Sequence, residues 1–359
     1  MHDMPTRQQL SCVARFVLFL VAALYLGHCI FQAWKSEIPS SRKLPIRCRT
    51  ESNMQFISFN YTKEKARGEM FDCSLKPYLE KWKISDEFLY KSQPINASSV
   101  VFVTYASSNH FGEARNGIRS MRSMFKNKII FYDLGLQESE VDELHNVCNL
   151  EIRKFAFENY PDFVSVLSGY NFKPIIMAEM FGEYNYFWMV DSSVRFFDVH
   201  PNLDSFYDSV SAGITETVAV RHPVGHSIFA TTDPRMYRYL PMDTEIAKEL
   251  EMIEATMFIS RSDFSREAIK WHALCALTKE CMAPPHSNLY CNFKQDRYEN
   301  HANCHRYDQS SINIILASML DRDGWKRRDR ANDDPFKNFL TVSRGDADQI
   351  PLFIPCRGN

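Results

Sequence analysis

The sequence lacks an excess of charge of either sign. It has 42 Lys and Arg residues against 44 Asp and Glu residues, and this balance excludes the basic surface with which most proteins bind nucleic acids. Glycine and proline are sparse, at 12 and 16 of 359 residues, which excludes collagen-like, linker-like and repeat architectures. With 45% hydrophobic and 13% aromatic residues, the composition predicts a folded protein with a well-filled core.

Several motifs of common chemistries are also absent. No G-x-G-x-x-G follows an apolar run, and neither G-x-x-x-x-G-K-[ST] nor H-E-x-x-H occurs. These absences argue against a dinucleotide-binding first turn, a P-loop and a zinc protease helix. The stretch GHSIF at 225–229 lacks the second glycine of a nucleophile elbow, so a serine hydrolase is not supported.

One long uncharged run is present near the N-terminus. Residues 16–34 read FVLFLVAALYLGHCIFQAW, without Asp, Glu, Lys or Arg, and this length spans the hydrocarbon core of a bilayer. The apolar part of a cleaved signal peptide is shorter and ends at small residues. We therefore predict a transmembrane signal-anchor at 16–34 after a cytoplasmic tail at 1–15. A cleaved signal, which makes the protein a secreted one, is the alternative.

The sequence contains opposing signals for the orientation of this span in the membrane. More Lys and Arg residues follow the span than precede it, which by itself favours a cytoplasmic C-terminal side. However, glycosylation sequons begin at Asn60 and Asn96, and eight of the ten cysteines follow the span, which suits an oxidising lumen. We predict a single-pass type II protein of the Golgi or another secretory-pathway membrane, with its C-terminal part lumenal.

The lumenal part divides into two regions. Residues 35–95 are polar and show no periodic pattern, so we predict a stem. From residue 96 to 359, apolar strand-like runs alternate with helical patterns. The expected strands are 100–105, 128–132, 150–157, 186–190 and 255–259, and the expected helices are 112–125, 141–148, 174–183, 264–278 and 308–320. This alternation predicts an α/β domain with a mostly parallel sheet and helices on both faces.

Four cysteines of this domain lie among histidines and raise the question of a zinc site. They are Cys275, Cys281, Cys291 and Cys304, and they lie near His286, His301 and His305. No C-x2-C pair occurs among them, and a closed zinc site typically starts from one. We therefore expect disulfides here rather than zinc, as is usual in an oxidising compartment.

Two acidic residues stand where ligands of such a fold bind. Asp191 follows the apolar run 186–190, and the carboxyl ends of parallel strands are where open α/β sheets hold their ligands. Its carboxylate either caps the turn that follows or holds a metal-bound diphosphate. Asp308 opens the helix at 308–320, either as an N-cap or as a functional group.

Four sequence segments, together with the predicted anchor and the Asp308-Gln309 pair, resemble those of a known protein family. KPIIMAEMF, WMVDSSVRF, GHSIFATTDPRMYRYLP and HRYDQSSINIIL resemble a family of invertebrate single-pass membrane proteins. The lumenal domain of that family has no assigned function and is distantly similar to GT-A glycosyltransferases. The resemblance covers roughly residues 95–359. It implies a GT-A-like fold, a nucleotide-sugar donor and a glycan, protein or lipid acceptor.

The resemblance also implies roles for individual residues. Asp308 is the expected base near the acceptor hydroxyl, with His226 as a second catalytic candidate, and Gln309 is expected to bind the acceptor. The expected donor-binding residues are Tyr105, Lys173, Asp191, Ser193 and Arg195.

The sequence departs from the GT-A pattern at one point. GT-A enzymes carry Asp-x-Asp after this strand, whereas this chain has Asp191-Ser192-Ser193. Three alternatives stay open: Mn²⁺ bound through Asp191 with fewer protein ligands, a metal-free site in which Arg195 and Lys173 offset the diphosphate charge, or loss of activity. In the last case the chain is a catalytically inactive binding protein of the membrane or cell surface.

Overall fold

The computed structural model describes most of the region after the predicted anchor. The described residues are 54–58, 66–197, 203–213, 218–220, 223–254, 256–320, 340–345 and 348–356. All of them belong to one compact unit, Cys48–Asn359. None of the helices in these ranges is long and apolar enough to cross a membrane. The predicted tail at 1–15, the predicted anchor at 16–34 and the sequon at Asn60 lie outside the described residues.

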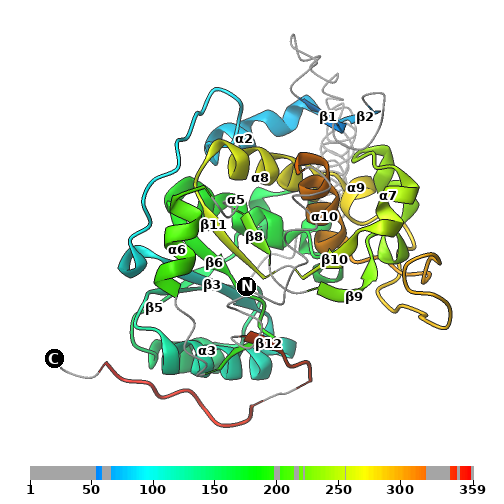
Figure 1. Ribbon diagram of the computed structural model, residues 1–359. Coiled ribbons are helices and arrows are strands. Elements are labelled where there is room, and N and C mark those ends of the chain that lie inside the picture. Colours follow the sequence, from blue (N-terminus) through cyan, green and yellow to red (C-terminus); the bar gives the residue numbers. More distant parts are fainter. Residues whose placement is uncertain are drawn as a thin grey trace, which may run out of the picture. The chain divides into compact units, whose positions relative to one another are not determined.

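A six-stranded sheet forms the centre of this unit, in the order β5-β4-β3-β6-β11-β8 (Figure 1). Its strands are β3 (Val101–Ala106), β4 (Ile129–Asp133), β5 (Leu150–Lys154), β6 (Tyr186–Met189), β8 (Val218–Val220) and β11 (Met257–Ser260). Strand β3 pairs in parallel with β4 and β6, and β4 pairs in parallel with β5. Strand β11 runs antiparallel to both β6 and β8. The predicted mostly parallel sheet is therefore confirmed.

Helices cover both faces of the sheet, as predicted. The longer ones are α3 (Phe111–Met124), α4 (Glu138–His145), α5 (Phe172–Glu183), α6 (Leu203–Ser211), α8 (Asp263–Ala276) and α10 (Tyr307–Met319). Every residue of β3 is buried, and its side chains alternate between two cores: Val101 and Val103 pack with α5, α8 and α10, whereas Phe102 packs with α3 and α6. Burial on both faces explains why this strand reads as an unbroken apolar run.

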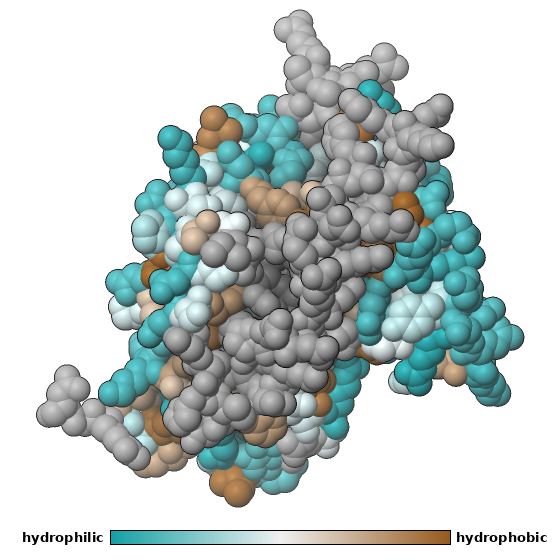
Figure 2. Space-filling model, in the orientation of Figure 1, coloured by the Kyte–Doolittle hydropathy of each residue, from teal (hydrophilic) through white to brown (hydrophobic). Residues whose placement is uncertain are grey.

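Short elements complete the unit. Three two-stranded sheets pair β1 (Gln55–Ser58) with β2 (Ala66–Met70), β9 (Pro223–Ser227) with β10 (Glu251–Ile253), and β7 (Val194–Phe196) with β12 (Leu340–Val342). The short helices are α2 (Lys76–Lys81), α7 (Thr244–Glu249) and α9 (Lys279–Met282). Figure 2 shows that hydrophilic side chains cover much of the described surface in this orientation, with hydrophobic residues in small, separate patches.

The predicted stem at 35–95 is wrong for the part of it that the structure describes. Phe56, Phe71 and Trp82 are each 2% exposed and belong to the core that α5 and α8 share. Gly68 lies so close to the backbone of Tyr239 that a side-chain Cβ at this position would overlap the Tyr239 carbonyl oxygen. Residues 54–58 and 66–84 are therefore part of the folded unit rather than a spacer.

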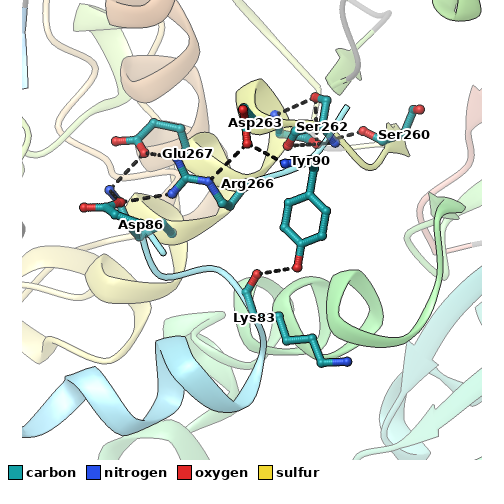
Figure 3. Close-up of polar contacts among 10 residues, drawn as sticks. Lys83, Asp86, Tyr90, Ser260, Ser262, Asp263, Arg266 and Glu267 are labelled. Atoms are coloured by element: carbon teal, nitrogen blue, oxygen red, sulfur yellow. Dashed lines mark hydrogen bonds and ion pairs between the residues drawn. The ribbon is translucent and has the colours of Figure 1, made fainter. Parts of the chain in front are cut away.

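Polar contacts tie the segment after Trp82 to helix α8 (Figure 3). The Tyr90 hydroxyl donates to the Lys83 carbonyl at 2.9 Å, and the Tyr90 amide donates to Asp263 Oδ1 at 2.8 Å. Asp86 Oδ1 accepts from Arg266 at 3.0 Å and from Lys270 at 2.5 Å. These contacts hold residues 86–90 against α8.

Three disulfides connect cysteines in the described part of the chain. They are Cys148–Cys356, Cys275–Cys281 and Cys291–Cys304. The last two use the four cysteines that the sequence places near histidines, so the prediction of disulfides there is confirmed. No group of three or more His, Cys, Asp or Glu side chains in the described ranges could hold a metal ion.

Candidate active site at the switch point of the sheet

A cavity of about 450 Å³ lies beyond the carboxyl ends of β3 and β6. The chain leaves β3 toward β4 and β5, then returns to place β6 on the other side of β3. This reversal of strand order is the switch point at which open α/β sheets bind their ligands. Tyr105 to Ser107 after β3 and Asp191 to Val194 after β6 line the cavity. The fold therefore places a cavity at the sheet edge where the sequence predicted a binding site.

Charged side chains of both signs line this cavity. The acidic residues are Glu113, Asp191, Glu254 and Asp308, and the basic residues are Lys173, Arg306 and Arg344. Such a mixture suits a ligand that has both an anionic group and hydroxyl groups, because cations bind phosphate oxygens and carboxylates accept from hydroxyls.

Lys173 stands at the centre of the charged group. Its ammonium is 2.6 Å from Asp191 Oδ2 and 3.8 Å from Asp308 Oδ2. It also lies over two aromatic rings, 5.4 Å from the centroid of Tyr105 and 5.0 Å from that of Tyr170, within the range of a cation–π contact. The side chain is 14% exposed. Lys173 thus joins the carboxylate that follows β6 to the carboxylate at the start of α10.

Burial disfavours the charged forms of Lys173, Asp191 and Asp308. The attraction between the ammonium and the carboxylates outweighs burial for Lys173 and Asp191 but not for Asp308. For Lys173, the charges of Asp191 and Asp308 outweigh burial and raise its pKa well above the ordinary value. For Asp191, burial is outweighed by Lys173 and by hydrogen bonds from Ser193, which lower its pKa. For Asp308, burial prevails and raises the pKa, although Lys173 opposes it. At neutral pH Lys173 is therefore an ammonium and Asp191 a carboxylate.

Local structure explains how Asp191 is held. It is the second residue after β6, and its Oδ1 accepts from the Ser193 amide at 3.1 Å and from the Ser193 hydroxyl at 2.9 Å. This is the turn-capping role that an aspartate at a strand end commonly takes. Because Oδ1 caps the turn, Oδ2 points to Lys173. The structure thus shows the turn-capping alternative for Asp191, and the cap also fixes the carboxylate at the cavity.

Three helices begin at the cavity. Asn109 and His110 just before α3, Phe172 and Lys173 in α5, and Asp308 in the first turn of α10 all line it. Unpaired backbone N–H groups and the helix dipole make such N-termini favourable positions for anions. The start of α5 is held in place by Asn171, whose side-chain amide donates to the Ala276 carbonyl at 2.8 Å.

The described residues do not fit a divalent metal at Asp191. A hard cation needs several oxygen ligands, yet Oδ2 of Asp191 is taken by the Lys173 ammonium and Oδ1 by Ser193. The other carboxylate near this point, Asp308, faces the same ammonium. The position at which a metal would neutralise charge is thus occupied by the side chain of Lys173.

Six residues predicted for the site line the cavity, and two do not. Those at the cavity are Tyr105, Lys173, Asp191, Ser193, Asp308 and Gln309. Tyr105 is 6% exposed, and its ring packs against Phe172. Gln309 donates from Nε2 to the Ile253 carbonyl at 3.1 Å. The roles assigned to these residues stay predictions.

Arg195 and His226 are the two that the structure places elsewhere. Arg195 is 7% exposed and donates from Nη1 to the carbonyls of Ser192 and Val194 at 2.7 and 3.0 Å, so its guanidinium holds the turn after β6. His226 is 5% exposed and stacks on Phe293 with centroids 5.2 Å apart. Burial lowers the pKa of His226 to about 4. Neither residue lines this cavity, so its geometry gives no support to the roles predicted for Arg195 and His226.

Several residues of the cavity were not predicted from the sequence, among them Glu254, Thr256, Arg306 and Arg344. The predicted sheet-edge residues follow strands, whereas Glu254 and Thr256 precede β11. Because β11 runs antiparallel to β6, with Met257 opposite Met189, its beginning lies at the carboxyl edge of the parallel strands. Arg344 arrives there through the pairing of β12 with β7. Arg306, next to Asp308, was the one that proximity in sequence could have revealed.

Comparison with known proteins gives distant similarities. Galactosyltransferase LgtC in complex with donor and acceptor sugar analogs is 14% identical with a TM-score of 0.40, covering 69% of this chain and 88% of that chain. Core-mannan synthase A (CmsA/Ktr4) from Aspergillus fumigatus, in a Mn/GDP form, is 12% identical with a TM-score of 0.35, covering 74% and 83%. No curated protein matches the sequence. Residues 46–178 match the family described as Protein of unknown function (DUF1647), a stretch that includes Tyr105 and Lys173 and ends before Asp191.

Proposed function

We propose that this chain is a glycosyltransferase of the secretory pathway. It transfers a sugar from a nucleotide-sugar donor to a hydroxyl group of a glycan, protein or lipid acceptor. The observation that carries the proposal is the cavity at the switch point, where a buried lysine between two carboxylates meets the N-termini of three helices. A diphosphate needs such cations and N–H groups, and a sugar needs such carboxylates.

The charges of the site suit a donor diphosphate that binds without a metal ion. Lys173 is joined in the cavity by the guanidinium groups of Arg306 and Arg344, and arginine binds phosphate oxygens through paired N–H groups. The Nε of Arg306 is buried and has no hydrogen-bond partner among the described residues, so it has a donor to offer. These three cations take the role that a divalent ion takes where it neutralises a leaving diphosphate.

A thermal-shift screen tests this function. The probes are UDP-glucose, UDP-galactose, UDP-N-acetylglucosamine and GDP-mannose, each added to residues 48–359 in EDTA and in Mn²⁺. One donor is expected to raise the melting temperature in both buffers, since a ligand at about 100 times its Kd stabilises the native state by about 2.7 kcal/mol. No shift with any nucleotide sugar would contradict the proposal and leave the inactive binding protein as the working alternative.

We also propose that the folded unit faces the lumen of the Golgi or a related compartment, anchored by one helix at 16–34. Three disulfides support an oxidising compartment. Asn96 is exposed, and its Oδ1 accepts from the amide and the hydroxyl of Ser98. Its side-chain nitrogen makes no hydrogen bond with the described residues, which leaves it accessible for glycosylation.

The lumenal placement predicts a glycan on Asn96. Asn96→Gln in full-length protein from a eukaryotic cell is expected to remove one N-glycosidase-sensitive step in gel mobility, because the sequon then lacks its acceptor. Asn292→Gln is the matched control, since Asn292 is also exposed but is not followed by Ser or Thr at the second position. An Asn96 that carries no glycan in the parent would contradict the lumenal placement.

A further inference from the structure

Glu254 differs from the other acidic residues of the cavity. Asp191 and Asp308 face Lys173. Glu113 accepts from the Gly345 amide at 2.6 Å and lies 3.2 Å from His110 Nδ1. Glu254, which also lines the cavity, makes no hydrogen bond and no ion pair with any residue that the structure describes. An unpaired carboxylate inside a cavity has its lone pairs available for a ligand.

A second group without a hydrogen-bond partner among the described residues lines the same cavity. Thr256 is 4% exposed and lines the same cavity, and its hydroxyl has no hydrogen-bond partner among the described residues. Buried hydroxyls are rarely left without a partner, because each costs free energy. Glu254 and Thr256 thus offer a carboxylate and a hydroxyl, two residues apart in sequence, and both are suited to a ligand with hydroxyl groups.

The backbone that carries Glu254 is held from α10. The side-chain amide of Asn313, which is fully buried, accepts from the Ile253 amide at 2.9 Å and donates to the Ile253 carbonyl at 2.9 Å. Gln309 donates to the same carbonyl at 3.1 Å. Gln309 and Asn313 are thus positioning residues that fix the start of the segment leading from β10 to β11, as a preorganised catalytic group requires.

We propose that Glu254 is the general base of the reaction and that Thr256 binds the acceptor hydroxyl beside it, an inference that rests on the proposed function. The acceptor O–H bond breaks and its proton goes to the Glu254 carboxylate. The acceptor oxygen forms a bond to the anomeric carbon of the donor sugar. The bond from that carbon to the diphosphate oxygen breaks, and the nucleoside diphosphate leaves with the electron pair.

The protonation behaviour of Glu254 supports this assignment over Asp308. Burial, reinforced by the charge of Asp191, raises the pKa of Glu254 to about 7, while Arg344 and Lys173 oppose the shift. A base with a pKa near the working pH is ionised in part of the population and still basic enough to take a proton. Burial raises the pKa of Asp308 as well, but Asp308 faces the Lys173 ammonium, whereas Glu254 forms no ion pair with the described residues.

The test uses full-length protein in detergent with the nucleotide sugar identified by the screen. Glu254→Gln is nearly isosteric but cannot accept the proton. It is expected to bind the donor with the parent's affinity and to release nucleoside diphosphate about 10² to 10⁴ times more slowly, with water as acceptor. In the parent, the rate should rise with pH around a midpoint near 7, and in the variant this midpoint should be absent. Thr256→Val should slow release without moving the midpoint.

Glu245→Gln is the control, because Glu245 is a largely exposed glutamate of α7 whose partner is Lys248. It should leave both the rate and the pH midpoint unchanged. The proposal is overturned if Glu254→Gln keeps the parent's rate, if it loses donor binding together with rate, or if Asp308→Asn and not Glu254→Gln removes the midpoint. A parent that binds no donor instead overturns the proposed function, and with it this assignment.

Discussion

Lys173→Met is expected to abolish nucleotide-sugar binding and to lower the free energy of unfolding by about 3 kcal/mol, near the lower end of the cost of breaking a buried ion pair. Lys173 is the cation that both Asp191 and Asp308 face. Without it, two carboxylates remain in the cavity with no ammonium between them. The loss of stability is measured by urea unfolding, and the loss of binding by titration calorimetry.

The loss in free energy of unfolding caused by Lys173→Met should increase as the pH rises. In the parent, Lys173 lowers the pKa of Asp191, which adds stability above the pKa of the unfolded chain, about 3.9; this contribution is lost as the pH falls. In the variant, both buried carboxylates have raised pKa values, so folding loses stability as the pH rises. The difference between the two proteins should therefore be largest near pH 7 and should shrink toward pH 4.

Two further variants make the Lys173 prediction specific. Lys173→Met combined with Asp191→Asn removes the uncompensated charge at Asp191, so it should regain part of the stability but none of the binding. Lys128→Met removes a more exposed lysine that pairs with Glu151, and should cost less than about 1 kcal/mol. A Lys173→Met protein that binds the donor as the parent does would contradict the account of the site.

A fragment that begins at residue 96 is expected not to fold, whereas residues 48–359 are expected to fold. The region before 96 supplies buried side chains to the core shared with α5 and α8. They are Met54, Phe56, Phe71, Leu75, Leu79, Trp82 and Ile84. Each contributes about 1.5–3 kcal/mol, so together they are as large as the margin of about 5–15 kcal/mol by which domains are stable. Near-UV circular dichroism and urea unfolding compare the two fragments.

A single substitution tests the same point within the longer fragment. Trp82 is 2% exposed and contacts the rings of Tyr78 and Tyr160 at 5.5 and 6.1 Å, so Trp82→Ala should cost about 3–5 kcal/mol. Leu89 is 78% exposed, and Leu89→Ala should change stability by less than about 0.5 kcal/mol. If the fragment 96–359 unfolds cooperatively, or if Trp82→Ala does not change stability, this account is contradicted and the predicted stem at 35–95 is supported.

The part of the fold that could be predicted is the part in which burial leaves a periodic signal. Strand β3 is buried throughout and α5 is buried on most sides, so both stand out as apolar segments. The region before 96 did not, because Phe71 and Trp82 lie in segments without a periodic apolar pattern. Their burial depends on grooves formed by segments far away in the sequence, as Gly68 against Tyr239 illustrates.

The site residues that could be predicted from the sequence are those at the ends of strands and the starts of helices. Asp191, Lys173 and Asp308 were predicted separately, and the structure brings them together around one ammonium. Glu254 and Thr256 were missed because the direction of β11 follows from its pairing with β6, which no local pattern encodes. Arg195 and His226 were chosen for their charge and chemistry, yet both side chains are used to hold the backbone or the core.

The most direct test of the central claim is the Kd of the identified nucleotide sugar, measured by titration calorimetry in EDTA and again in Mn²⁺. Lys173 occupies the position at Asp191 where a metal would neutralise the diphosphate, so the account predicts the same Kd in both buffers. Binding that appears only with Mn²⁺ would contradict it, because Asp191 would then have to release Lys173 and serve as a metal ligand.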